Sequence, residues 1–186
     1  MSGLSGVERS GAGPSMVAPA TDSAPAILDH SISAEIVAAA AAIEGEWRAL
    51  ADRAKVPVYQ RYDWVDAFLR TVAAAQGIAP AILRIRVGGR TAAILPLGIE
   101  RRGPLRIARM LGGGHANIRM PIVDPDAANA LADPAQLAEV VIAALRHAGR
   151  RVDLLDLDAL PLSWNGCTVP LATHPAARPA RLPVGH

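Results

Sequence analysis

The sequence predicts an α+β domain in which helices cover an antiparallel sheet. Apolar residues recur at helical spacing between residues 34 and 76, and they alternate at every second residue between 81 and 111. A second helical pattern then starts at Asp133-Pro134 and precedes one more alternating segment. The predicted order is therefore two helices, three strands, one helix and one strand, within 186 residues that suit a single domain.

Two helices are expected in the first half of the folded part. The first should run from about Ala34 to Ala54, with Ser33 as its N-cap, because the larger apolar residues of this segment fall on one face. The second should run over residues 61–76, where an apolar stripe faces one way and Asp66 and Arg70 form a pair on another face. Gly77 supplies its C-terminal stop.

Three strands should follow as a meander. Residues 81–87 alternate apolar and polar side chains, and Gly88-Gly89 is typical of a two-residue hairpin turn. Residues 90–99 form the second strand, in which Pro96 suggests a sheet edge or a bulge. The third strand covers residues 105–111, after a turn that contains Gly103-Pro104.

The last elements are a helix and a strand. Asp133 as N-cap and Pro134 at the first helical position begin the helix, Gly149 ends it, and residues 152–157 alternate as a strand. The expected organisation is a disordered tail over residues 1–33, one domain over 34–166, and an irregular proline-rich tail over 167–186.

Composition excludes several classes of protein. The net charge is only +2 and aromatic residues make up 3% of the chain, which argues against nucleic-acid binding. The sequence has no apolar run of about 20 residues that could span a membrane, and no secretory signal pattern. With Cys167 as the single cysteine, the expected location is the cytoplasm. Lys55 is the single lysine, so arginine carries almost every positive charge.

The sharpest local motif is Arg109-Met-Leu-Gly112-Gly113-Gly114, which has the form R-x-x-G-x-G. Backbone N–H groups of such a loop bind a pyrophosphate when a helix N-terminus follows at once, but the next expected helix starts about twenty residues later. A plain glycine-rich turn is therefore the alternative.

Three polar residues continue the same loop. His115, Asn117 and Arg119 follow the glycines, and His115 is either a general base, an anion ligand or an ordinary surface residue. No metal site is expected, since Asp153 and Asp156 should lie on opposite faces of their strand.

An ordered series of short motifs carries a family resemblance. The series is Glu46-Trp47-Arg-Ala-Leu50, Val58-Tyr-Gln-Arg-Tyr-Asp-Trp64, Val87-Gly-Gly-Arg90 with Leu95-Pro-Leu97, Leu111-Gly-Gly-Gly114, Asp153-Leu-Leu-Asp-Leu-Asp158 and Trp164-Asn-Gly166. It resembles the CelD/BcsL-type GNAT proteins, which carry a BioF2-like acetyltransferase module related to FemAB-type transferases. The resemblance covers residues 34–166 and corresponds to the N-terminal of two GNAT-like halves.

The resemblance implies a GNAT-like half-fold and acetyl-CoA-dependent N- or O-acetyl transfer to a sugar or amine, in cellulose, exopolysaccharide or envelope biosynthesis. Ligand binding would fall on the loop from Arg109 to Arg119. The family's catalytic elements are expected in a second half, so the chain resembles a truncated member and no catalytic residue is assigned. The alternative is a non-catalytic half that binds substrate, a missing second half or another copy of itself.

Overall fold

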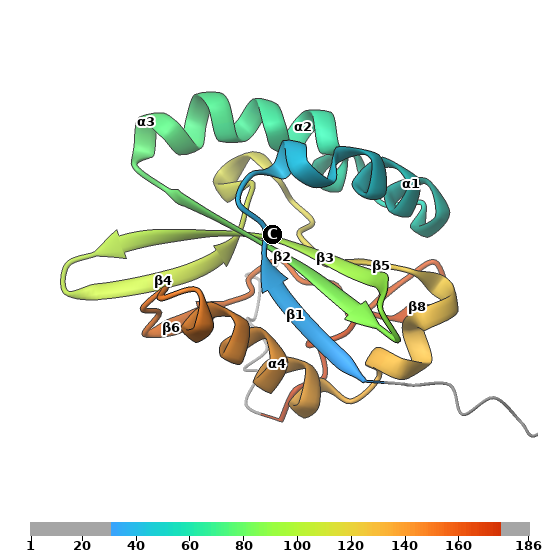
Figure 1. Ribbon diagram of the computed structural model, residues 1–186. Coiled ribbons are helices and arrows are strands. Elements are labelled where there is room, and N and C mark those ends of the chain that lie inside the picture. Colours follow the sequence, from blue (N-terminus) through green and yellow to red (C-terminus); the bar gives the residue numbers. More distant parts are fainter. Residues whose placement is uncertain (1–30, 176–186) are drawn as a thin grey trace, which may run out of the picture.

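The computed structural model describes residues 31–175, which form an α+β fold with a mixed six-stranded sheet (Figure 1). This confirms the predicted fold class and is consistent with a GNAT-like architecture. The strands are β1 (Ile32–Ile36), β2 (Ala79–Val87), β3 (Arg90–Arg102), β4 (Leu105–Met110), β5 (Ile122–Val123) and β6 (Leu154–Asp156), with a separate hairpin of β7 (Ser163–Trp164) and β8 (Cys167–Thr168). The α-helices are α1 (Glu44–Ala54), α2 (Tyr62–Phe68), α3 (Ala74–Gln76) and α4 (Pro134–His147).

The chain enters the sheet before the first helix, at β1. The prediction of a helix from Ala34 with Ser33 as N-cap is wrong, because Ser33 pairs with Arg86 in an antiparallel ladder between β1 and β2. The same residues alternate Ile, Ser, Ala, Glu, Ile, and the apolar ones pack against the core beneath α4. The helical pattern therefore starts only after β1, in a 3₁₀ turn (Ala40–Ile43) that leads into α1. The expected boundary between residues 33 and 34 falls inside β1, and residues 1–30 of the predicted tail lie outside the described residues.

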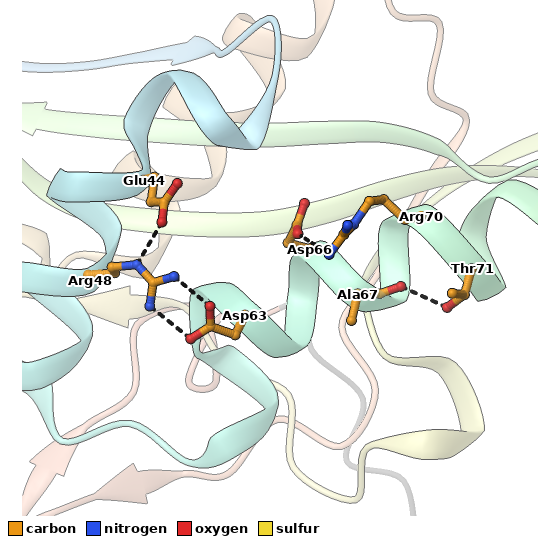
Figure 2. Close-up of polar contacts among 7 residues, drawn as sticks. All are labelled: Glu44, Arg48, Asp63, Asp66, Ala67, Arg70 and Thr71. Carbon is orange, nitrogen blue, oxygen red and sulfur yellow. Dashed lines mark hydrogen bonds and ion pairs between the residues drawn. The ribbon is translucent and has the colours of Figure 1, made fainter.

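Helices α1 and α2 are joined by a charged contact as well as by their apolar faces. Arg48 of α1 donates through its Nε to Glu44 and through both terminal nitrogens to Asp63 of α2 (Figure 2). The predicted pair of Asp66 and Arg70 is present at 2.7 Å. The second predicted helix is continuous through α2, a π-helical turn (Leu69–Ala73) and α3, and it stops as expected at Gly77, whose φ is +67°.

The meander of β2, β3 and β4 forms as predicted. Gly88 and Gly89 both have positive φ in the hairpin turn between β2 and β3. Pro96 does not mark a sheet edge, because β3 pairs with β2 on one side and with β5 and β4 on the other. The Pro96 carbonyl accepts from Leu111 N on that second side, between the β5 and β4 ladders. Proline has no N–H, and at Pro96 this group would point to the gap between β5 and β4. The sheet therefore loses no strand-to-strand hydrogen bond at Pro96.

The last strand of the sheet corrects the expectation that the sheet is wholly antiparallel. After α4 the chain returns as β6, which pairs in parallel with β4. Asp133 caps α4 by accepting from Ala135 N and Gln136 N, as the Asp-Pro signal predicts. A strand, a covering helix and a parallel strand make a crossover, and the crossover places the carboxyl ends of β4 and β6 at the same edge.

The chain remains ordered beyond the expected boundary at residue 166. Strands β7 and β8 pair around Asn165-Gly166, and both of these turn residues have positive φ, as a type I′ hairpin requires. Val169, Pro170 and Leu171 follow and are buried. The irregular tail expected from residue 167 thus begins with a strand and three buried residues, and its residues 176–186 lie outside the described residues.

The sheet is buried on both faces. Side chains of β2 and β3 alternate between a core under α4 and a core under α1 and α2, so Leu83 and Leu95 belong to the first and Ile82 and Ile94 to the second. Figure 1 shows the two helical layers on opposite sides of the strands. Among residues 31–175 no helix is long and apolar enough to cross a bilayer.

Candidate functional site

The carboxyl ends of the parallel strands bring two charged segments together. Arg109 near the end of β4 lies opposite Asp156 at the end of β6, and its Nη2 donates to the Asp156 carboxylate. The Nη1 of the same guanidinium lies 3.1 Å from Glu100 on β3. Arg109 therefore sits between two carboxylates, and all three side chains are more than two-thirds buried.

A second arginine, in the loop after β4, makes a similar ion pair with a carboxylate after β6. Arg119 is 8% exposed, and its Nη2 donates to Asp158 over 2.6 Å. The backbone N–H of Arg119 also donates to the carbonyl of Ala159. The loop after β4 is thus held to the segment after β6 by a charge pair and a backbone bond.

Gly112 turns the chain at the end of β4. Its φ is +127°, and a Cβ at this position would lie 2.7 Å from the Cβ of Ala116. Glycine is therefore required both by backbone conformation and by space. The following residues, Gly113 to His115, make one 3₁₀ turn that folds back beside the end of the strand.

The loop is anchored from the helical layer by a buried glutamine. Gln60 is 1% exposed, and its Nε2 donates to the carbonyl of Ile118 at 3.1 Å. The backbone carbonyl of Gln60 accepts from the indole of Trp47 at 2.8 Å, so α1, Gln60 and the loop form one chain of contacts. Such buried hydrogen bonds fix the loop more firmly than exposed ones would.

The other predicted site residues lie on the exposed side of this loop. Gly113, Gly114, His115 and Asn117 are exposed, and the His115 and Phe68 rings lie in a T-shaped arrangement with 6.4 Å between ring centres. The structure brings the seven predicted residues together at the end of β4 and in the loop that follows it. Two arginines hold this loop, half-buried Arg109 and buried Arg119, whereas four residues are exposed and Gly112 forms the turn.

The electrostatics of the two arginines limit what they can bind. Burial lowers the pKa of Arg109, but the hydrogen bond and charge of Asp156, with the charges of Glu100 and Asp158, outweigh it and raise the pKa overall. The guanidinium thus stays charged and committed to carboxylates. The exposed loop from Gly113 to Asn117 can meet an anionic ligand without displacing either carboxylate.

Buried polar atoms without a hydrogen-bond partner gather in the same place. They are the Nε atoms of Arg109 and Arg119 and the Oδ1 of Asp158. Buried polar atoms of this kind usually bind ordered water or a ligand. The cluster is therefore a polar interior region beside the glycine loop.

The arginines of this cluster are among the predicted site residues, but its carboxylates are not. Glu100 comes from β3, Asp156 ends β6, and Asp158 follows two residues later. The order of a strand, a helix and a strand in the sequence favours parallel pairing of the two strands. Such pairing places Asp156 and Asp158 beside the glycine loop. Within residues 31–175, no group of three or more His, Cys, Asp or Glu side chains could hold a metal ion.

Comparison of the chain with protein-family models, with curated proteins and with solved structures finds no match in any of the three.

Proposed function

We propose that the chain is a GNAT-type acyl-transfer module that binds an acyl-CoA donor at the carboxyl ends of β4 and β6. The observation that supports this most is the meeting of the glycine loop with the ends of two parallel strands, since open α/β sheets bind ligands outside the carboxyl ends of such strands. The exposed backbone of Gly113 and Gly114 is the part of this edge that an anionic donor can approach without displacing a carboxylate.

The chemistry would be direct transfer from acetyl-CoA, the donor that the family resemblance implies. The nitrogen or oxygen of a sugar or amine acceptor attacks the thioester carbonyl carbon, the carbon–sulfur bond breaks, and CoA leaves as the thiol with the proton that the acceptor loses. Such a reaction depends on positioning and on backbone donors more than on a covalent nucleophile. This activity would take place in the cytoplasm and would serve cellulose, exopolysaccharide or envelope biosynthesis.

Calorimetric titration with acetyl-CoA tests the proposal, with two variants at one loop position. Gly113 has a φ of +47° and open space where a Cβ would lie, and Asp and Asn are the side chains that tolerate such a backbone best. Gly113→Asn should keep binding with one-to-one saturation, whereas Gly113→Asp should weaken it at least tenfold, because its carboxylate repels the donor phosphates. Absence of binding by the unmodified chain would reject the acyl-CoA site.

A second candidate is a non-catalytic half that binds a partner chain. Leu105 and Leu154 are 47% and 49% exposed, and the register of β4 with β6 puts them on the same face of the sheet. β6 has no strand on its outer edge among the described residues. Sedimentation velocity over a range of concentrations tests self-association: Leu154→Asp should abolish it, whereas Leu162→Asp, at a 70% exposed leucine elsewhere, should not.

A further inference from the structure

A pocket of about 230 Å³ lies away from the glycine loop, between the C-terminal end of α1, residues 120–128 and the β7–β8 hairpin. Its walls are mostly apolar and include Met120, Pro121, Val123, Trp164, Val169 and Pro170. None of the seven residues predicted for the glycine-loop site lines it. The pocket is therefore independent of the proposed acyl-CoA site.

One wall of the pocket is fixed by hydrogen bonds to the end of α1. The indole of Trp164 donates to the carbonyl of Lys55 at 3.1 Å, and the amide of Asn165 lies 3.4 Å from the carbonyls of Ala54 and Lys55. The hairpin thus satisfies backbone acceptors that a helix C-terminus leaves open. These donors also offset part of the negative partial charge at the C-terminal end of α1.

The charged groups of the pocket are cationic. Arg53 and Lys55 line it, and no Asp or Glu does. Arg53 is paired with the buried carboxylate of Asp124 at 2.8 Å. Lys55 is exposed and makes no ion pair with any residue between 31 and 175. Lys55, whose ammonium group is not committed to a carboxylate of these residues, is therefore part of the wall of an apolar cavity.

This ammonium and a neighbouring thiol are unique in the chain. Lys55 is the single lysine among 19 basic residues, and Cys167, which also lines the pocket, is the single cysteine. A lysine presents a compact charge on a flexible stem, which suits a single carboxylate at the edge of a cavity. The thiol gives the pocket a chemical reporter that no other position shares.

We propose that this pocket binds a small amphipathic carboxylate, with its apolar body between the proline, valine and tryptophan walls and its carboxylate on the ammonium of Lys55. The volume equals that of about eight water molecules in the liquid, which suits a chain of about six to eight carbon atoms. The apolar part gains from leaving water, and the cation fixes the orientation of the bound molecule.

Binding of octanoate to the full chain tests the proposal, with octan-1-ol and octylamine as matched probes. Octanoate should saturate one site by calorimetry and should slow alkylation of Cys167 by iodoacetamide at the same concentrations. Octan-1-ol should bind about tenfold more weakly because it lacks the charged hydrogen bond, and octylamine should not protect the thiol. Equal protection by octylamine, or heat of octanoate binding without protection of Cys167, would overturn the proposal.

Variants separate the charge from the cavity. Lys55→Met should weaken octanoate binding about tenfold and leave the binding of octan-1-ol unchanged. Lys55→Arg should bind octanoate as the unmodified chain does. Arg150→Met, at an exposed cation outside the pocket, should change the binding of neither probe. Ala128→Phe should reduce binding of both probes by filling the cavity. Far-UV circular dichroism checks that each variant folds. A folded Lys55→Met protein that binds octanoate as tightly as the unmodified chain would contradict the assignment.

Discussion

Replacement of Gly98 by alanine should destabilise the fold, because two side chains occupy the space of its missing Cβ. Gly98 lies in β3 opposite Arg109, and a Cβ there would be 2.5 Å from Cγ2 of Ile78 and 2.7 Å from Cδ2 of Leu111. Both distances are about 1 Å short of an ordinary carbon–carbon contact. The Ile78 atom is on a β-branched side chain that cannot rotate away freely. Either β3 or the segment between α3 and β2, which contains Ile78, must therefore shift. We expect a loss of about 1–3 kcal/mol in the free energy of unfolding.

Gly45→Ala is the matched control for this change. Gly45 lies in the first turn of α1 and has open space where a Cβ would be, so alanine should stabilise the helix by about 0.5 kcal/mol. The two variants add the same methyl group and should shift the urea midpoint, followed by circular dichroism, in opposite directions. If Gly98→Ala is as stable as the unmodified protein, the crowding at β3 does not constrain the fold.

The remaining predictions concern the two cores and a charge pair. Trp47→Phe should cost about 2 kcal/mol of unfolding free energy, because it leaves the buried carbonyl of Gln60 without its donor. Leu83→Ala should cost about 3 kcal/mol by opening a cavity under α4, measured by the same denaturation. Hydrogen bonds from Arg48 lower the pKa of Asp63 in the folded state, so this pair stabilises the protein above the unfolded-state pKa, and the contribution is lost as pH falls from about 4 through the folded-state pKa. Unfolding free energies measured between about pH 6 and pH 3 should therefore fall less steeply in Asp63→Asn than in the unmodified chain.

Local signals predicted the elements that depend on nearby residues. The cap at Asp133 and Pro134 places the start of α4 correctly, and the Gly88-Gly89 turn fixes the β2–β3 hairpin, because each is formed by contacts within a few residues. The strand β1 was missed since its five residues gain stability by pairing with β2, about fifty residues later. Its alternation was present in the sequence, but Ser33 also matched a helix cap.

The candidate site divides in the same way. The glycine loop and both arginines could be found from the sequence, because they are adjacent in the chain. Their partners Asp156 and Asp158 could not be paired with them without the parallel return of β6, which depends on how α4 packs on the sheet. Asn165-Gly166 is also a local signal, typical of a two-residue hairpin turn, although the sequence analysis predicts no hairpin there.

The position of β3 has a consequence for how the molecule unfolds. One strand supplies side chains to the apolar layer on each side of the sheet, Leu95 to one and Ile94 to the other. Neither layer can keep its packing once the strand leaves. Amide hydrogens of β2 and β3 should therefore exchange with solvent with one common free energy of opening, through a single global opening rather than two separate ones.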